Sequence, residues 1–176
     1  MFIACSSPHP LSKEVILDKI EYLESDGVFA SNEIKIHRDI YYWSKYYGDF
    51  TSISREPYKM DTSYVYHLNL LFAFNNGVKH YALENHEEYR ADSASVIAFN
   101  TKAYIRGCEG MKRVYEQILN KKGDVSKNES IEKFYLKLET NGNEEFAREF
   151  VMKNLKEHGL ENILISYKSR DISNNP

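Results

Sequence analysis

The sequence has few cysteines, few prolines and no long apolar run. Its two cysteines, Cys5 and Cys108, are too few for a disulfide framework, so we predict a reduced, cytoplasmic protein. The longest apolar stretch is well short of the about 20 residues that cross a membrane, so no membrane partner is expected. With 176 residues, the chain is most simply one globular domain over 1–176, whose polar end, 168–176, should be frayed.

An excess of basic charge is also missing. The formal net charge is −3 and the isoelectric point is near 6.1. Domains that bind nucleic acids are usually strongly basic, so a nucleic-acid partner is not favoured. Specific enzyme motifs are absent too, because the sequence has no His-Glu-x-x-His, no Cys-x-x-Cys and no phosphate-binding glycine loop. We therefore predict neither a metal ion nor a cofactor.

Aromatic residues are abundant, at 14%, and include 14 tyrosines. The densest apolar segment runs from Tyr64 to Phe74, where only His67 and Asn69 are polar, so this segment belongs in the core. Two structures fit the segment 64–83. It is either a β-hairpin that turns at residues 75–77, or a helix that ends at Gly77. Because helices are predicted on both sides, we favour the helix.

Apolar residues at helical spacing predict further helices in the first two-thirds of the chain. Ser12 should cap a helix that ends at Gly27, and a second helix should follow Ser31 or Asn32. Asn85 should cap the next, with glycines interrupting it before a last amphipathic segment ends near Gly123. These elements are predicted over 12–27, 32–48, 85–105 and 111–123.

The last third of the chain shows a different pattern. Apolar and polar residues alternate over 134–138, helical spacing follows over 146–155, and a short apolar run covers 163–167. Strand, helix and strand in that order form a βαβ unit. The predicted fold class is therefore α+β, with a helix-rich first two-thirds and a C-terminal βαβ element packed on one core.

Titratable side chains are densest between His80 and Asp92. His80 and Glu84 lie one helical turn apart, a spacing that suits proton transfer, and His86 follows closely. With Arg90 or Arg106 as an anion ligand, these residues predict a hydrolase acting on a nucleotide, a nucleic acid or another phosphorylated substrate. Plain helix stabilisation is the simpler explanation of the carboxylates. Cys108 would be a nucleophile only with a lowered pKa, and a buried structural cysteine is the simpler interpretation.

A second group of candidates surrounds the single tryptophan. Arg38, Tyr41, Tyr42 and Tyr46 fall outside the apolar stripe that Trp43 continues. Tyrosine and arginine dominate the energetics of protein interfaces. We therefore rank first a small cytosolic interaction protein, a regulator or inhibitor, that docks on a protein or other macromolecular partner through a tyrosine-rich surface. The hydrolase is the alternative.

Overall fold

The computed structural model describes residues 11–47, 63–89, 92–123 and 127–158, and these residues form six α-helices and no strand. A π-helical turn, η1, covers Leu23–Gly27, and a 3₁₀ turn, η2, covers His86–Glu88. The α-helices are α1 (Lys13–Tyr22), α2 (Glu33–Tyr47), α3 (His67–Glu84), α4 (Ser93–Lys121), α5 (Glu129–Asn141) and α6 (Asn143–His158).

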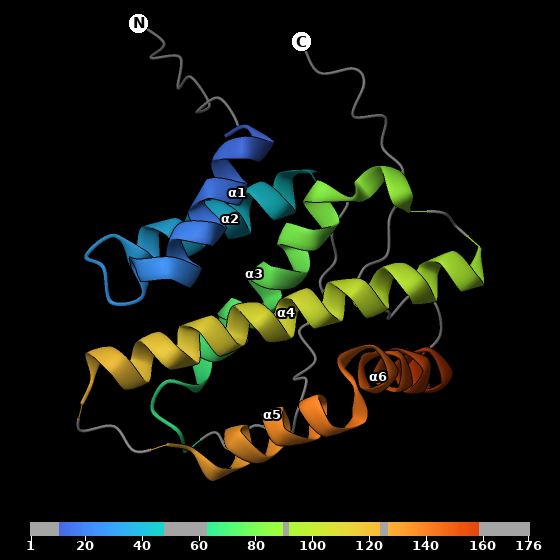
Figure 1. The fold of residues 1–176 in the computed structure, drawn as a ribbon. Coiled ribbons are helices and arrows are strands. Elements are labelled where there is room, and N and C mark those ends of the chain that lie inside the picture. The colour runs from blue at the N-terminus through green and yellow to red at the C-terminus, as the bar shows by residue number, and fades with distance from the viewer. Residues whose placement is uncertain (1–10, 48–62, 90–91, 124–126, 159–176) are drawn as a thin grey trace, which may run out of the picture.

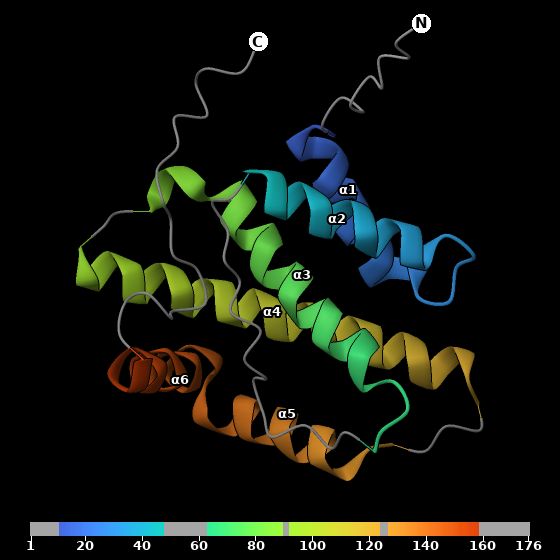
Figure 2. The same ribbon diagram turned by 180° about the vertical axis from the view of Figure 1, so that it is seen from behind.

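The longest helix, α4, lies at the centre of the molecule. Helices α1 and α2 lie on one side of it and α5 and α6 on the other, while α3 crosses it diagonally (Figure 1; Figure 2). The most extensive contact between two elements is that of α3 with α4, followed by that of α4 with α6. None of the helices in the described ranges combines the length and the apolar character that a membrane span requires.

Side-chain caps fix where three of these helices begin. The hydroxyl of Ser12 accepts a hydrogen bond from the backbone N–H of Val15, which confirms the predicted start of α1. The side chain of Asp92 caps α4, and that of Asn128 caps α5. The start predicted at Asn85 is wrong, because this residue follows α3 and leads only into the short 3₁₀ turn η2.

The predicted α+β fold is wrong: the C-terminal βαβ element is not formed. Residues 134–138, predicted as a strand, lie within α5, whose buried residues recur at helical intervals: Ile131, Phe134, Tyr135 and Leu138. Leu136 is exposed, although the alternating pattern put it beside Phe134. Within five residues, Phe134, Leu136 and Leu138 fit the two-residue repeat of a strand, while Phe134 and Leu138 also fit the spacing of a helix. The strand was therefore predicted from the wrong repeat. The second predicted strand, 163–167, and the tail 168–176 lie outside the described residues.

The segment 64–83 forms helix α3, as favoured, but the helix does not end at Gly77. A Cβ atom on Gly77 would lie 2.5 Å from the backbone oxygen of Arg106 on α4. The glycine therefore allows the two helices to cross at close range rather than ending one of them. Gly107 and Gly110 likewise lie inside α4, which is continuous where two helices were predicted. A Cβ on Gly107 would lie 2.7 Å from the ring of Phe74.

Aromatic rings join α4 to its neighbours on both sides. The buried ring of Tyr104 meets Phe74 of α3 edge-on at 5.5 Å and Phe150 of α6 at 4.5 Å, measured between ring centroids. Burial raises the pKa of the Tyr104 hydroxyl well above its ordinary value. Much of the tyrosine excess is thus used in the core, where Tyr135 also donates a hydrogen bond to the backbone oxygen of Cys108.

The close crossing gives the first testable prediction. Gly77→Ala should destabilise the protein by about 1–3 kcal/mol in urea denaturation, because α3 and α4 must move apart to admit the new methyl group. Gly123→Ala is the matched control, since a Cβ there meets nothing within 4 Å. Equal stability of the two variants would show that the crossing is looser than described.

Candidate functional site

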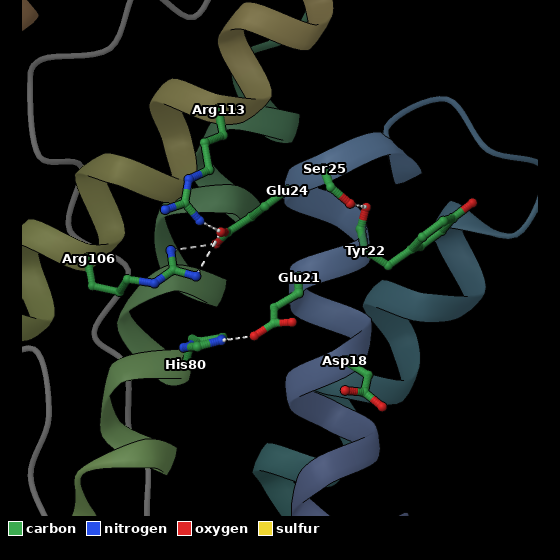
Figure 3. Close-up of a pocket in the computed structure, with 8 residues that line it drawn as sticks. All are labelled: Asp18, Glu21, Tyr22, Glu24, Ser25, His80, Arg106 and Arg113. Atoms are coloured by element: carbon green, nitrogen blue, oxygen red, sulfur yellow. Dashed lines mark hydrogen bonds and ion pairs between the residues drawn. The ribbon is translucent and has the colours of Figure 1, made fainter.

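The π-helical turn η1 carries a buried carboxylate. Glu24 is only 4% exposed, and its two oxygens accept hydrogen bonds from Arg106 Nη1 and Nη2 at 2.8 and 2.7 Å. Arg113 Nη1 donates to Glu24 Oε2 at 2.8 Å. A buried carboxylate is stable only when charge and hydrogen bonds replace its water, and here two guanidinium groups do so. Figure 3 shows Glu24 pointing from η1 between both arginines of α4.

One stripe of α4 is built to receive this turn. Gly110 lies between the two arginines, and a Cβ on it would lie 2.6 Å from Glu24 Oε1. One turn beyond Arg113, Gln117 donates to the backbone oxygens of Leu23 and Glu24 at 3.1 and 2.7 Å. Backbone carbonyls at the end of a helix need such partners. The stripe continues with Lys121, which donates to the backbone oxygen of Asp26 at 2.8 Å.

An open hollow of about 770 Å³ lies beside this cluster, between α1, η1, α3 and α4. Buried His80 of α3 lies in its wall, with Nε2 3.2 Å from Glu21 Oε1 and Nδ1 3.0 Å from Glu84 Oε2. Glu21 points across from α1 toward the imidazole (Figure 3). An imidazole between two carboxylates can transfer a proton. The residues that line the hollow are Asp18, Glu21, Tyr22, Glu24, Ser25, His80, Arg106 and Arg113.

The structure brings together part of the predicted hydrolase site. His80 and Arg106 both line the hollow, and Glu84 contacts His80. His86 is not among the lining residues, and its Nδ1 lies 3.2 Å from the backbone oxygen of Leu83. Arg90 lies outside the described residues. Within the described ranges, no three His, Cys, Asp or Glu side chains are grouped so that they could hold a metal ion.

Cys108 is a structural residue. Its side chain is fully buried in α4, and burial raises the pKa of the thiol well above its ordinary value, so the thiolate that a nucleophile requires is disfavoured. Sequence reasoning missed Glu21 and Glu24 as members of the hollow. The only available signal was the spacing of Arg106, Gly110, Arg113, Gln117 and Lys121, which puts polar and small residues on one stripe of a helix.

Three of the four predicted interaction residues, Arg38, Tyr41 and Tyr42, lie on the outer side of α2. Arg38 is exposed, Tyr41 and Tyr42 are 56% and 60% exposed, and the two tyrosine rings meet edge-on at 5.5 Å between centroids. Tyr46 belongs to α2, but its side chain is not described. The opposite side of the helix is buried through Ile36, Ile40 and Trp43, as the apolar stripe predicted. The indole Nε1 of Trp43 donates to the backbone oxygen of Leu11 at 2.7 Å.

Exposed apolar residues continue from α2 onto α3. Ile34 of α2 is 83% exposed, and Val65, just before α3, is 74% exposed. Phe72 bridges the two helices, because its ring centroid lies 5.0 Å from that of His37. We call this surface the α2–α3 face; it consists of Ile34, Arg38, Tyr41, Tyr42, Val65, Leu68 and Phe72. Its α3 half was missed, since the apolar run 64–74 was expected to be core on all sides.

Polar side chains join α2 and α3 beneath the face. Asn69 of α3 donates to Glu33 Oε1 at 2.8 Å, and Asn76 lies 3.5 Å from the Nδ1 of His37. A cavity of about 10 Å³, close to the volume needed for one water molecule, lies between these groups and η1. Burial lowers the pKa of His37, although Glu33 opposes this effect. A neutral His37 therefore suits the folded protein.

The buried carboxylate gives a second prediction. Glu24→Gln should destabilise the protein by about 3 kcal/mol, because Arg106, whose side chain is largely buried, and Arg113, whose side chain is half exposed, then lose their counter-charge. Asp26→Asn is the control in the same turn, since Asp26 is exposed and its ion pair with Lys121 should contribute at most about 1 kcal/mol. Urea denaturation followed by the fluorescence of Trp43 measures both. A loss for Glu24→Gln no larger than that of the control would contradict the role assigned to Glu24.

The geometry thus offers two surfaces of different chemistry: a charged hollow around His80 and an apolar, tyrosine-bearing face on α2 and α3. Each has to be assessed from its own residues. Comparison of the chain with protein-family models, with curated proteins and with solved structures found no match.

Proposed function

We propose that this chain is a small cytoplasmic interaction protein, a regulator or inhibitor, that docks on a macromolecular partner through the α2–α3 face. The observation that carries the proposal is the run of exposed apolar and aromatic side chains across two adjacent helices. Exposed apolar patches of this kind mark interaction surfaces, and tyrosine supplies a large contact area at a low cost in side-chain entropy.

The exposed tyrosines contribute little to folding. Tyr41 and Tyr42 lie opposite the buried side of α2, and each keeps more than half of its surface in water. The helix beneath them is held in place from the core side by Trp43 and by an ion pair of Asp39 with Lys19 at 3.1 Å. A rigid helix that carries exposed rings is already arranged for binding, so few side chains lose freedom on association.

The proposal predicts that replacing both rings, in Tyr41→Ala/Tyr42→Ala, abolishes capture of a binding partner by the immobilised protein. The melting temperature should barely change, because surface substitutions cost within about 0.5 kcal/mol. Leu136→Ala is the matched control. It removes an exposed apolar side chain from α5, far from the face in the fold (Figure 1), and should leave the amount of captured partner unchanged. Undiminished capture by the double variant would remove the proposal.

A second candidate function is a hydrolase of phosphorylated substrates, and it is favoured by the position of His80 between two carboxylates in the hollow. In such a reaction one water molecule is consumed, and the imidazole and a carboxylate pass its proton to the leaving group. Arg113, whose side chain is half exposed, is the better anion ligand, since Arg106 already uses both terminal nitrogens on Glu24.

The hydrolase is tested by incubating the purified protein with p-nitrophenyl phosphate and nucleoside triphosphates. Activity, where present, should fall at least a hundredfold in His80→Ala and Glu84→Ala, consistent with the loss of general acid–base catalysis. His86→Ala, a histidine outside the hollow, should retain it. An inactive wild-type protein, or activity that these substitutions leave unchanged, would rule against this candidate.

A further inference from the structure

Helix α3 presents a ridge with the spacing of a helix-packing seam. Within α3, Leu68, Phe72, Asn75 and Lys79 follow one another at intervals of four, three and four residues. This alternation is the heptad pattern by which one helix packs along another. The apolar members Leu68 and Phe72 are exposed, and so is Val65, which immediately precedes the helix. Buried residues such as Phe74 and Val78 occupy the other side of α3, against α4.

The ridge ends at a cation, Lys79. Its side chain is half-buried, and burial lowers its pKa from 10.5 to about 8. No carboxylate in the described part of the chain forms an ion pair with it. A half-buried ammonium in this state is destabilising until an acidic group approaches it.

The acids near the face are already in use. Glu33 accepts hydrogen bonds from the backbone N–H of Phe29 and from Asn69, and Asp39 pairs with Lys19 and Lys35. Arg38 is exposed on the same face and forms no ion pair with a described residue. The α2–α3 face is therefore apolar along its length and positively charged at its edges.

We propose that the α2–α3 face binds an amphipathic helix of a partner protein, whose apolar side packs along the α3 ridge and whose flanking carboxylates meet Lys79 and Arg38. This inference rests on the proposed function and names the class of partner. Helix-in-groove recognition uses anchors at such spacings, and charges at the flanks select the partner. A second copy of the chain is a poorer occupant, because Glu33 and Asp39, the described acids near the face, are already paired and would not meet the cations of the other copy.

The test uses a phage-displayed library of helical peptides with leucine at the a and d positions of the heptad and either glutamate or lysine at e and g. Selection on the full chain should enrich glutamate-rich peptides. An enriched peptide, synthesised and measured by titration calorimetry, should bind at least tenfold more weakly to Phe72→Ala and to Leu68→Ala. Lys79→Glu should reverse the preference, so that the lysine-rich counterpart binds better.

A stability measurement separates recognition from folding. Lys79→Met removes the buried charge, so its urea midpoint at pH 7 should rise while its affinity for the acidic peptide falls. Because the folded-state pKa lies below the unfolded value, the wild-type protein gains stability between pH 8 and 10.5, and the midpoint difference should vanish above that range. Lys153→Met, on the exposed side of α6, is the control and should alter neither quantity.

Three outcomes would overturn the inference: the library yields no enriched peptide, the enriched peptides show no preference for glutamate, or Phe72→Ala binds the peptide as tightly as the wild-type protein. If the protein is a dimer in solution and Phe72→Ala makes it monomeric, the face is instead the interface between two copies of the chain. If Tyr41→Ala/Tyr42→Ala abolishes partner capture while the library selects no acidic helix, the interaction function stands and the class of partner is wrong.

Discussion

The structure depends on the burial of one carboxylate, that of Glu24. A charge withdrawn from water must be matched by opposite charge in good geometry, and Arg106 and Arg113 provide it only if η1 lies directly on α4. That close approach requires Gly110, whose missing side chain leaves room for the carboxylate. The π-helical turn, a geometry frequent at functional sites, thus ties α1 to α4 and leaves the hollow beside His80 open.

A second close approach between elements fixes the position of α3. Gly77 brings α3 against α4, so one side of the helix is fixed by backbone contact and does not depend on the opposite side for its position. The outer residues are then free to be selected for something other than packing. Phe72 and Lys79 illustrate this. Phe72 exposes a large ring to water and Lys79 half-buries a charge, and both arrangements are unfavourable for the stability of the free chain.

Sequence reasoning succeeded where the signal was local and long. The cap at Ser12 and the buried stripe of α2 follow from side chains within a few residues of one another. It failed at 134–138, because five residues cannot distinguish two periodicities, and at Gly77, Gly107 and Gly110, because a glycine that breaks a helix and one that admits a neighbouring helix look alike in sequence. The partner of each helical glycine lies on another element, so only the fold identifies it.

Only the α3 and α4 residues of the hollow were predicted from the sequence. His80, Glu84 and Arg106 were found because titratable groups cluster in sequence, whereas Glu21 and Glu24 come from the first helical region, more than fifty residues earlier. The tyrosines show the same limit: Tyr41 and Tyr104 are alike in type, but one is exposed and one buried. Since Lys79, at the end of the α3 ridge, and His80, in the wall of the hollow, are adjacent on α3, one helix carries both surfaces. The two proposed functions therefore use different residues and do not compete for one surface.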